Sequence, residues 1–349
     1  MPFFRWSSAT YPAAVKVLSL GGHGFGWDDQ ILQGIFGRGL TDKLVTCYRR
    51  SLFRDVTDAR WKATRFRSRA DLIDSTKGLL PDEGSLDYLS DQELQELVNA
   101  LRGCPEVGTP AVWVFDACSM SSIEILAQLD GFPEWVVASF DEEPSQGIPF
   151  ASALARLDNA DVPPSAESVV AAMVAEFARV YRSAPALPGR FGGDYFSLLG
   201  LRSDSSTLAT VVNAVRDFVQ QARPVLQHNS GLVDEIFTKS SSIPRLFRMK
   251  YIADLGSLLK CFVALQGDAS NIQAVQEVRG FAAATYDAIF NKAKVVAYKY
   301  AGSRYKDADG LSVFWPVDKR DFEKHADMHR ELNFARATDW TNFCHLFFS

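Results

Sequence analysis

The sequence lacks the features that mark membrane-spanning and exported proteins. Its 349 residues contain no apolar run of the ~18 residues that a transmembrane helix requires. Residues 1–6 lack the long apolar centre and the small-residue cleavage site of a signal peptide. We therefore predict a cytoplasmic protein that has no contact with a membrane.

Cysteine and histidine are both scarce, at five residues each. The odd number of cysteines and their scattered positions do not fit a disulfide framework, and a reducing compartment is the simplest interpretation. No two cysteines have the C-x-x-C spacing of a zinc ribbon. His325 and His329 are suitably spaced for a metal, but Ala326 stands where the metallopeptidase motif has glutamate. We predict no metal site.

The sequence also has no excess of basic residues, as its formal net charge of −5 shows. This balance argues against a nucleic-acid-binding surface spread over the protein. With 47% hydrophobic and 23% charged residues, the composition is that of an ordinary globular protein. The length suits a catalytic domain with an appended region.

Two short apolar segments, residues 15–20 and 111–115, each end in a turn of small residues. Both predict buried parallel strands. His23 follows the first segment and Cys118 follows the second. If the strands are neighbours, an imidazole and a thiol meet at the carboxyl edge of the sheet. That pair is the minimum that a cysteine hydrolase needs.

Helical patterns alternate with strand patterns along the rest of the chain. A strand is predicted at 135–139, and a late strand pair at 294–300 and 311–316. Helices are predicted after residue 90, after Cys118, and at 165–183, 206–223, 250–265, 271–292 and 321–335. This alternation predicts an α/β sandwich. We divide the chain into a catalytic domain, 1–200, and a mainly helical region, 201–349, that includes the strand pair.

The glycine-rich turn at residues 21–26 has two readings. Its spacing is not G-x-G-x-x-G and no GK[ST] follows, which disfavours a nucleotide-binding enzyme. Glycines beside His23 let a substrate approach the backbone closely and leave amide donors unhindered. A lone histidine in a turn is as often structural, but a partner at Cys118 favours catalysis.

Cys118 lies just past the second strand, two residues after Asp116. We expect a helix to start at the cysteine, where the helix dipole lowers the pKa of a thiol. The alternative is a buried, inert cysteine.

These segments resemble the clostripain family of cysteine peptidases, in the caspase-like clan. Gly22-His23-Gly24 and Asp116-Ala117-Cys118 are similar to its histidine and cysteine motifs. Weaker similarities cover most of the chain, from Tyr11-Pro12 to Thr338-Asp339-Trp340. The resemblance implies a caspase-like αβα sandwich around a mostly parallel sheet, and no cofactor apart from calcium, for which the sequence indicates no ligands.

The resemblance further implies an endopeptidase with a His-Cys dyad. His23 is then the general base or the imidazolium partner, and Cys118 is the nucleophile. The backbone N–H groups of Gly24 and Cys118 hold the oxyanion. The residues themselves suggest the same roles, since a glycine at 24 frees an amide and a cysteine in a strand-to-helix turn presents its own.

Members of the family often cleave after arginine or lysine, whose side chain binds carboxylates. Asp116 occupies the place of one such carboxylate. A second acid is common in a Pro-Gly-acid-Gly pattern, but this chain has Pro144-Ser145-Gln146-Gly147, with a neutral Gln146. We expect cleavage after Arg or Lys, with Asp141, or one of the glutamates at 142–143, as the compensating acid. The alternative is that residues 141–143 form a solvated acidic loop.

Many family members are zymogens that cut themselves at a basic residue before the cysteine. The segment 60–85 is basic and turn-rich, and its candidate cleavage sites are Arg65, Arg67, Arg69 and Lys77. A solvated surface loop accounts for this composition equally well.

The family usually has another strand and helix before the segment at Tyr11-Pro12. The chain is therefore expected to be shortened, to have a smaller sheet, or to be completed by a partner. The competing function is a non-catalytic caspase-like module that binds a protein partner through residues 201–349 in a signalling or defence assembly. A scaffold needs neither His23 nor Cys118, which disfavours this alternative.

Overall fold

A five-stranded sheet forms the centre of the protein, in the order β1-β2-β3-β4-β6. The computed structural model describes residues 2–10, 13, 15–21, 91–104, 108–144, 146–158, 163–185, 192–246, 249–267 and 271–348. The strands of this sheet are β1 (Val17–Gly21), β2 (Val112–Asp116), β3 (Trp135–Ala138), β4 (Ser197–Arg202) and β6 (Val296–Ala301).

The sheet is mostly parallel, as predicted. β1, β2 and β3 pair in parallel, whereas β4 is antiparallel to both β3 and β6. The predicted strands at 15–20 and 111–115 are therefore direct neighbours. Their register places Gly21 opposite Asp116, so both strands end at the same level of the sheet.

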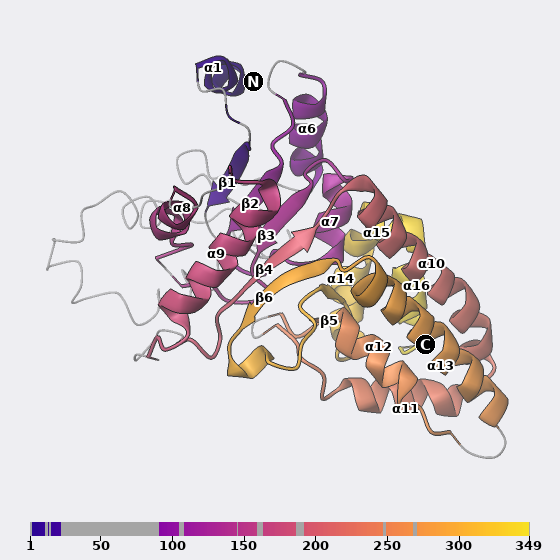
Figure 1. Ribbon diagram of the computed structural model, residues 1–349. Helices are drawn as coiled ribbons and strands as arrows, with labels where there is room; N and C mark the ends of the chain where they lie inside the picture. Colours follow the sequence, from indigo (N-terminus) through magenta and orange to yellow (C-terminus); the bar gives the residue numbers. More distant parts are fainter. Residues whose placement is uncertain are drawn as a thin grey trace, which may run out of the picture.

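Side chains of β2 alternate between two cores, which is why a continuous apolar run forms a central strand. Trp113 and Phe115 point into one core and Val112 and Val114 into the other. The second core is closed by α8 (Phe150–Asp158) and α9 (Ala166–Tyr181), which lie on one side of the sheet in Figure 1. The first core is closed by α6 (Asp91–Arg102), α7 (Ile123–Leu129) and the carboxyl-terminal helices. These three layers are the αβα sandwich that the sequence predicted.

The carboxyl-terminal region is mainly helical and extends the first core away from the sheet (Figure 1). This region also contains a separate two-stranded antiparallel sheet, formed by β5 (Ile252–Asp254) and β7 (Ser312–Phe314). Its helices are α10 (Ser205–Gln227), α11 (Ser230–Ser240), α12 (Leu255–Val263), α13 (Ile272–Tyr286), α14 (Lys319–Glu331), α15 (Asn333–Thr338) and α16 (Trp340–His345). A π-helical turn (Asp287–Lys292) continues α13, and a short 3-10 turn (Ser303–Tyr305) follows β6. At the other end of the chain, α1 (Pro2–Thr10) precedes β1.

Two sequence predictions about this region need correction. The segments 294–300 and 311–316 do contain strands, but β6 pairs with β4 and β7 pairs with β5, so they do not pair with each other. The helix predicted over 250–265 begins only at Leu255, because residues 252–254 form β5 and the Asp254 side chain caps the helix.

Among the residues that the structure describes, no helix combines the length and the apolar character needed to cross a membrane.

Candidate active site

Cys118 lies in a tight turn immediately after β2. The turn includes Ser119, whose φ of 61° is in the left-handed region. The helix predicted to start at the cysteine begins later: Ser122 caps α7, accepting the N–H of Ile125 at 3.1 Å, and the first helical residue is Ile123. The expectation that Cys118 sits at a helix amino terminus is therefore wrong, because a turn separates it from the first helical N–H groups.

Backbone hydrogen bonds fix this turn from two directions. Ser119 N–H donates to Asp141 O (2.8 Å) and Ser121 N–H donates to Ser139 O (3.0 Å), which ties the turn to the chain after β3. Ser312 N–H donates to Ser121 O at 2.9 Å, which ties it to β7. The cysteine turn is thus clamped between the catalytic sheet and the carboxyl-terminal region.

The Cys118 thiol is buried, with 7% of the residue exposed, and it contacts the acidic segment 141–143. The sulfur accepts the backbone N–H of Glu143 at 3.3 Å. The thiol donates to Glu142 Oε2 at 3.7 Å. A carboxylate and a backbone N–H therefore both contact the candidate nucleophile.

Asp116 ends β2 and contacts the same segment further along. Its Oδ1 accepts the Ile148 N–H at 2.9 Å. Burial raises the pKa of Asp116 above its ordinary value of 3.8, although hydrogen bonds with Ile148 and Glu143 partly offset this. Gly147 has a φ of +69°, and a β-carbon there would lie 2.6 Å from Asp116 Oδ2. Only glycine lets the loop pass so close to the carboxylate.

The acidic segment after β3 is buried, so the alternative of a solvated acidic loop is wrong. Asp141, Glu142 and Glu143 are 1%, 2% and 8% exposed. Asp141 accepts a hydrogen bond from the Tyr305 hydroxyl, whereas Glu142 and Glu143 contact the cysteine. Gln146 is exposed in the following turn. The structure thus brings Cys118, Asp116, Glu142 and Glu143 together and directs Asp141 to Tyr305.

Sequence reasoning missed the aromatic residues that support this site. The Tyr181 hydroxyl donates to Gly147 O at 2.8 Å and holds the loop against Asp116. Burial, followed by the negative charges of Asp116 and Glu143, raises the pKa of Tyr181. Tyr305 lies 164 positions from Asp141 in the sequence, and neither tyrosine carries a motif. No local signal in the sequence marks such contacts.

Several predicted residues lie outside the described part of the chain. These are His23, Gly24, Arg65, Arg67, Arg69 and Lys77. Their roles therefore remain predictions from the sequence.

Within the described residues, no group of three or more His, Cys, Asp or Glu side chains is arranged to hold a metal ion. His325 stacks on Tyr251 with 3.9 Å between ring centroids. His329 Nε2 lies 3.2 Å from Glu124 Oε1 in a fully buried pair. Both histidines are therefore engaged in packing and pairing.

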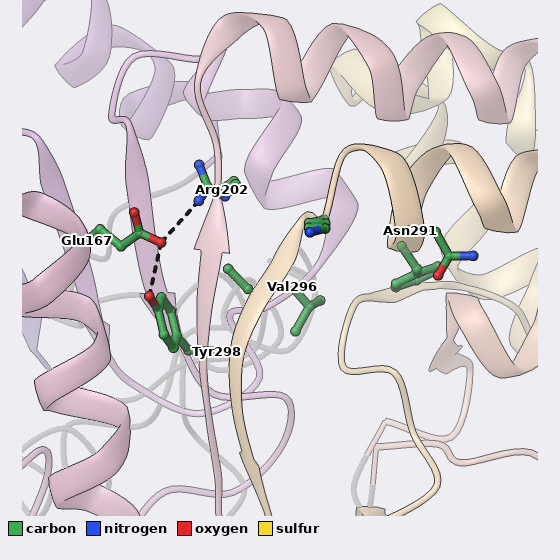
Figure 2. Close-up of a pocket in the computed structure, with 8 residues that line it drawn as sticks. Glu167, Arg202, Asn291, Val296 and Tyr298 are labelled. Atoms are coloured by element: carbon green, nitrogen blue, oxygen red, sulfur yellow. Dashed lines mark hydrogen bonds and ion pairs between the residues drawn. The ribbon is translucent and has the colours of Figure 1, made fainter.

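A surface pocket of about 470 Å³ lies at the opposite end of the sheet from the cysteine. Figure 2 shows Glu167 between Arg202 and Tyr298. One oxygen, Glu167 Oε1, accepts from Arg202 at 3.1 Å and from the Tyr298 hydroxyl at 3.0 Å. The Arg202 guanidinium also lies 4.5 Å from the centre of the Trp135 ring. Glu167 thus binds both Arg202 and Tyr298, and the pocket lies away from Cys118.

A sequence model of peptidase family C11, the clostripain family, matches residues 65–346. The match covers roughly four-fifths of the chain and includes Cys118, the Asp116 strand and the acidic segment. The chain belongs to the clostripain family. It is accordingly a cysteine peptidase, as the paired strand ends had indicated.

Two solved structures of C11 proteases share this fold. One is a secreted C11 cysteine protease from Bacteroides thetaiotaomicron in complex with an irreversible peptide inhibitor, with a TM-score of 0.52 and 17% identity over 97% of this chain and 76% of that chain. The other is an inactive zymogen C11 protease from Parabacteroides distasonis, with a TM-score of 0.51 and 14% identity over 97% and 74%. The search of curated proteins found no match to this chain. At these identities the likeness concerns the fold alone.

Proposed function

We propose that this clostripain-family peptidase is an endopeptidase with a His23-Cys118 dyad. One observation carries the proposal. β1 and β2 are parallel neighbours, and Gly21 lies opposite Asp116 at their ends. His23 follows Gly21 and Cys118 follows Asp116 by the same two positions. Equal offsets from paired strand ends favour a meeting of the two side chains.

In the proposed reaction, Cys118 gives its thiol proton to His23 and the sulfur bonds to the scissile carbonyl carbon. The backbone N–H groups of Gly24 and Cys118 stabilise the oxyanion. His23 then passes the proton to the amine as the C–N bond breaks. Water cleaves the resulting thioester: it transfers a proton to His23, which returns it to the sulfur as the C–S bond breaks.

We further propose that the substrate has arginine or lysine at P1, the residue before the cleaved bond. The support is a set of acids near the thiol: the buried Glu142 and Glu143, which contact Cys118, and the half-buried Asp116, which contacts Glu143. Buried carboxylates require a cationic or hydrogen-bonding partner, and a guanidinium supplies both. Glu142 and Glu143 compensate for the neutral Gln146, whose side chain is exposed. Asp141 is committed to Tyr305 and has no direct role in this proposal.

A panel of fluorogenic peptides with Arg, Lys, Asp or an apolar residue at P1 tests the function. Wild type should cleave the Arg and Lys peptides, and Cys118→Ala should lose essentially all turnover because it has no nucleophile. EDTA should leave the rate unchanged, since the reaction as proposed uses no metal. Absence of Cys118-dependent turnover, before and after limited proteolysis, would favour the non-catalytic binding module instead.

We also propose that the enzyme is activated by self-cleavage in the segment 60–85, at Arg65, Arg67, Arg69 or Lys77. The basic composition of this segment matches the proposed P1 preference. Incubated wild-type protein should split into two fragments, whereas Cys118→Ala stays intact. Mass spectrometry of the fragments identifies the bond. Intact wild type after prolonged incubation, with full activity on peptides, would contradict self-activation.

The compartment is proposed as the cytoplasm. The four cysteines in the described residues, Cys104, Cys118, Cys261 and Cys344, are all free thiols. Free thiols fit a reducing compartment. Recovery of the protein from the culture medium of its native host would overturn this assignment.

A further inference from the structure

The nucleophile of this peptidase is hydrogen-bonded to a carboxylate. Cys118 donates its S–H to Glu142 Oε2 at 3.7 Å, and both residues are almost completely buried. The Glu142 backbone forms a bridge with Phe196 beside β4, which fixes the position of this residue. The contact is therefore built into the fold and is not an accident of a surface side chain.

This contact opposes catalysis. The reactive form of a cysteine is the thiolate. A carboxylate that accepts the S–H keeps the proton on the sulfur, and its negative charge repels a second negative charge placed beside it. The S–H is directed toward Glu142.

The same pocket contains the means to relieve the contact. Glu143 binds the sulfur through its backbone N–H, and its carboxyl group interacts with Asp116. Because the Glu142 carboxylate and the Glu143 backbone contact the same sulfur, we expect a cationic side chain that reaches Asp116 and Glu143 to lie beside Glu142. A guanidinium carries five N–H donors and forms two parallel bonds to a carboxylate, which makes it a stronger partner than a thiol.

We propose that Glu142 restrains the Cys118 thiol in the free enzyme and that a basic P1 side chain releases it by binding the Glu142 carboxylate. Glu142 is thus a positioning residue that couples occupancy of the pocket to the reactivity of the nucleophile. A peptide without a basic P1 residue leaves the restraint in place. The inference rests on the proposed cleavage after Arg or Lys and adds regulation of the same site.

The test is the rate at which iodoacetamide alkylates Cys118 in the full-length protein at pH 7, followed by mass spectrometry of the Cys118 peptide. n-Butylguanidinium serves as the probe of the pocket, and n-butylurea as its neutral control of similar shape. The guanidinium should accelerate alkylation of wild type about tenfold, which corresponds to a decrease of about one unit in the pKa of the thiol. The urea should not.

Variants separate the restraint from a general loss of structure. Glu142→Gln should be alkylated about tenfold faster than wild type without any probe, because the repelling charge is gone, and the guanidinium should add little. Glu176→Gln is the matched control, since Glu176 is a buried carboxylate on α9, away from the cysteine, that pairs with Arg156 and Arg179. It should leave both the basal rate and the guanidinium response as in wild type.

Slower alkylation of wild type with n-butylguanidinium, or an unchanged rate, overturns the inference even if Glu142→Gln fails to fold. If the peptide panel shows Arg or Lys preference while alkylation ignores the guanidinium, only the restraint is wrong. If no peptide is cleaved while the guanidinium accelerates alkylation, the restraint stands and the proposed peptidase specificity fails.

Discussion

At the scale of single residues, Asp116 connects the end of β2 to the pocket that we propose for the P1 side chain. It is partly buried, accepts the Ile148 N–H and lies against Gly147. Burial raises its pKa above 3.8, so the native protein binds a proton at Asp116 more tightly than the unfolded chain does. A charged Asp116 therefore opposes folding, a cost that fits its proposed role in binding a basic P1 side chain.

The substitution Asp116→Asn should weaken kcat/KM for Arg and Lys peptides by roughly thirtyfold or more, since losing one partner of a desolvated charge pair costs about 2–5 kcal/mol. Because the pKa of Asp116 is raised, wild-type activity on these peptides should decline at a higher pH during acidification than an ordinary aspartate would cause. The measurement is kcat/KM against pH for both proteins with Arg and apolar P1 peptides.

Asp116→Asn should lower activity but raise the free energy of unfolding at neutral pH. A raised folded-state pKa means that the contribution of Asp116 is fully present below the unfolded pKa and is lost as pH rises through the folded pKa. Asp116→Asn should therefore gain stability relative to wild type at pH 7 and lose that advantage in acid. Urea unfolding at both pH values measures this. Equal stability of the two proteins at pH 7 would contradict the raised pKa.

At the scale of elements, the turn after β6 supports the cysteine turn through Asp141. Tyr305, in the 3-10 turn, donates its hydroxyl to the Asp141 carboxylate, and Asp141 O accepts Ser119 N–H. Burial, then the charge of Asp141, strongly raises the pKa of Tyr305, so the phenol remains a donor at any physiological pH. Tyr305, which belongs to the carboxyl-terminal region, thereby helps to fix Ser119, the residue next to the nucleophile.

Tyr305→Phe should destabilise the protein by about 1–3 kcal/mol, because it removes a hydrogen bond to a buried, charged carboxylate. Tyr298→Phe is the matched control: its hydroxyl bonds Glu167, whose side chain is 48% exposed (Figure 2). The control should cost well under half as much, since water replaces the lost bond. Denaturant unfolding of both variants gives the comparison. Equal losses of unfolding free energy would contradict the support that Tyr305 gives to the cysteine turn through Asp141.

The sequence predicted the strand ends that form the site because they combine an apolar run with a small-residue turn, which is a local pattern. It did not predict the late start of α7, because the left-handed conformation of Ser119 depends on bonds to residues 139–141. It left the burial of residues 141–143 open, since acidic side chains are buried only when distant groups accommodate them. The pairing of β7 with β5 likewise depends on tertiary contacts between very short strands.

At the scale of the whole molecule, the two regions share one sheet. β4 spans the predicted boundary at residue 200, and β6 from the carboxyl-terminal region pairs along it. A buried pair of Glu124 and His329 also joins α7 to α14, and Glu124 Oε1 accepts the Phe314 N–H of β7 at 2.8 Å. The carboxyl-terminal region is thus part of the catalytic fold.

A fragment of residues 1–200 should therefore fail to fold independently. It lacks β6 and the end of β4, and it exposes the face of β2 and α7 that the carboxyl-terminal helices cover. Calorimetry should show no cooperative unfolding transition, whereas the full chain shows one. A cooperative transition in the fragment would show that residues 1–200 form an independent catalytic domain.

The cysteine turn is fixed mainly by main-chain groups, and this has an evolutionary consequence. Ser119 N–H, Ser121 N–H and Ser121 O all bond to other backbone atoms, and such bonds form whichever side chains the residues carry. Selection at this turn therefore acts more on the backbone conformation than on the identity of the side chains. Substitutions at position 119 are tolerated as long as the new residue accepts a positive φ, which β-branched residues resist. Ser121 and Ser122 also act through their side chains, since Ser121 Oγ donates to Gly310 O and Ser122 Oγ caps α7. A turn that is held through its backbone can therefore keep the nucleophile in place while side chains around it change.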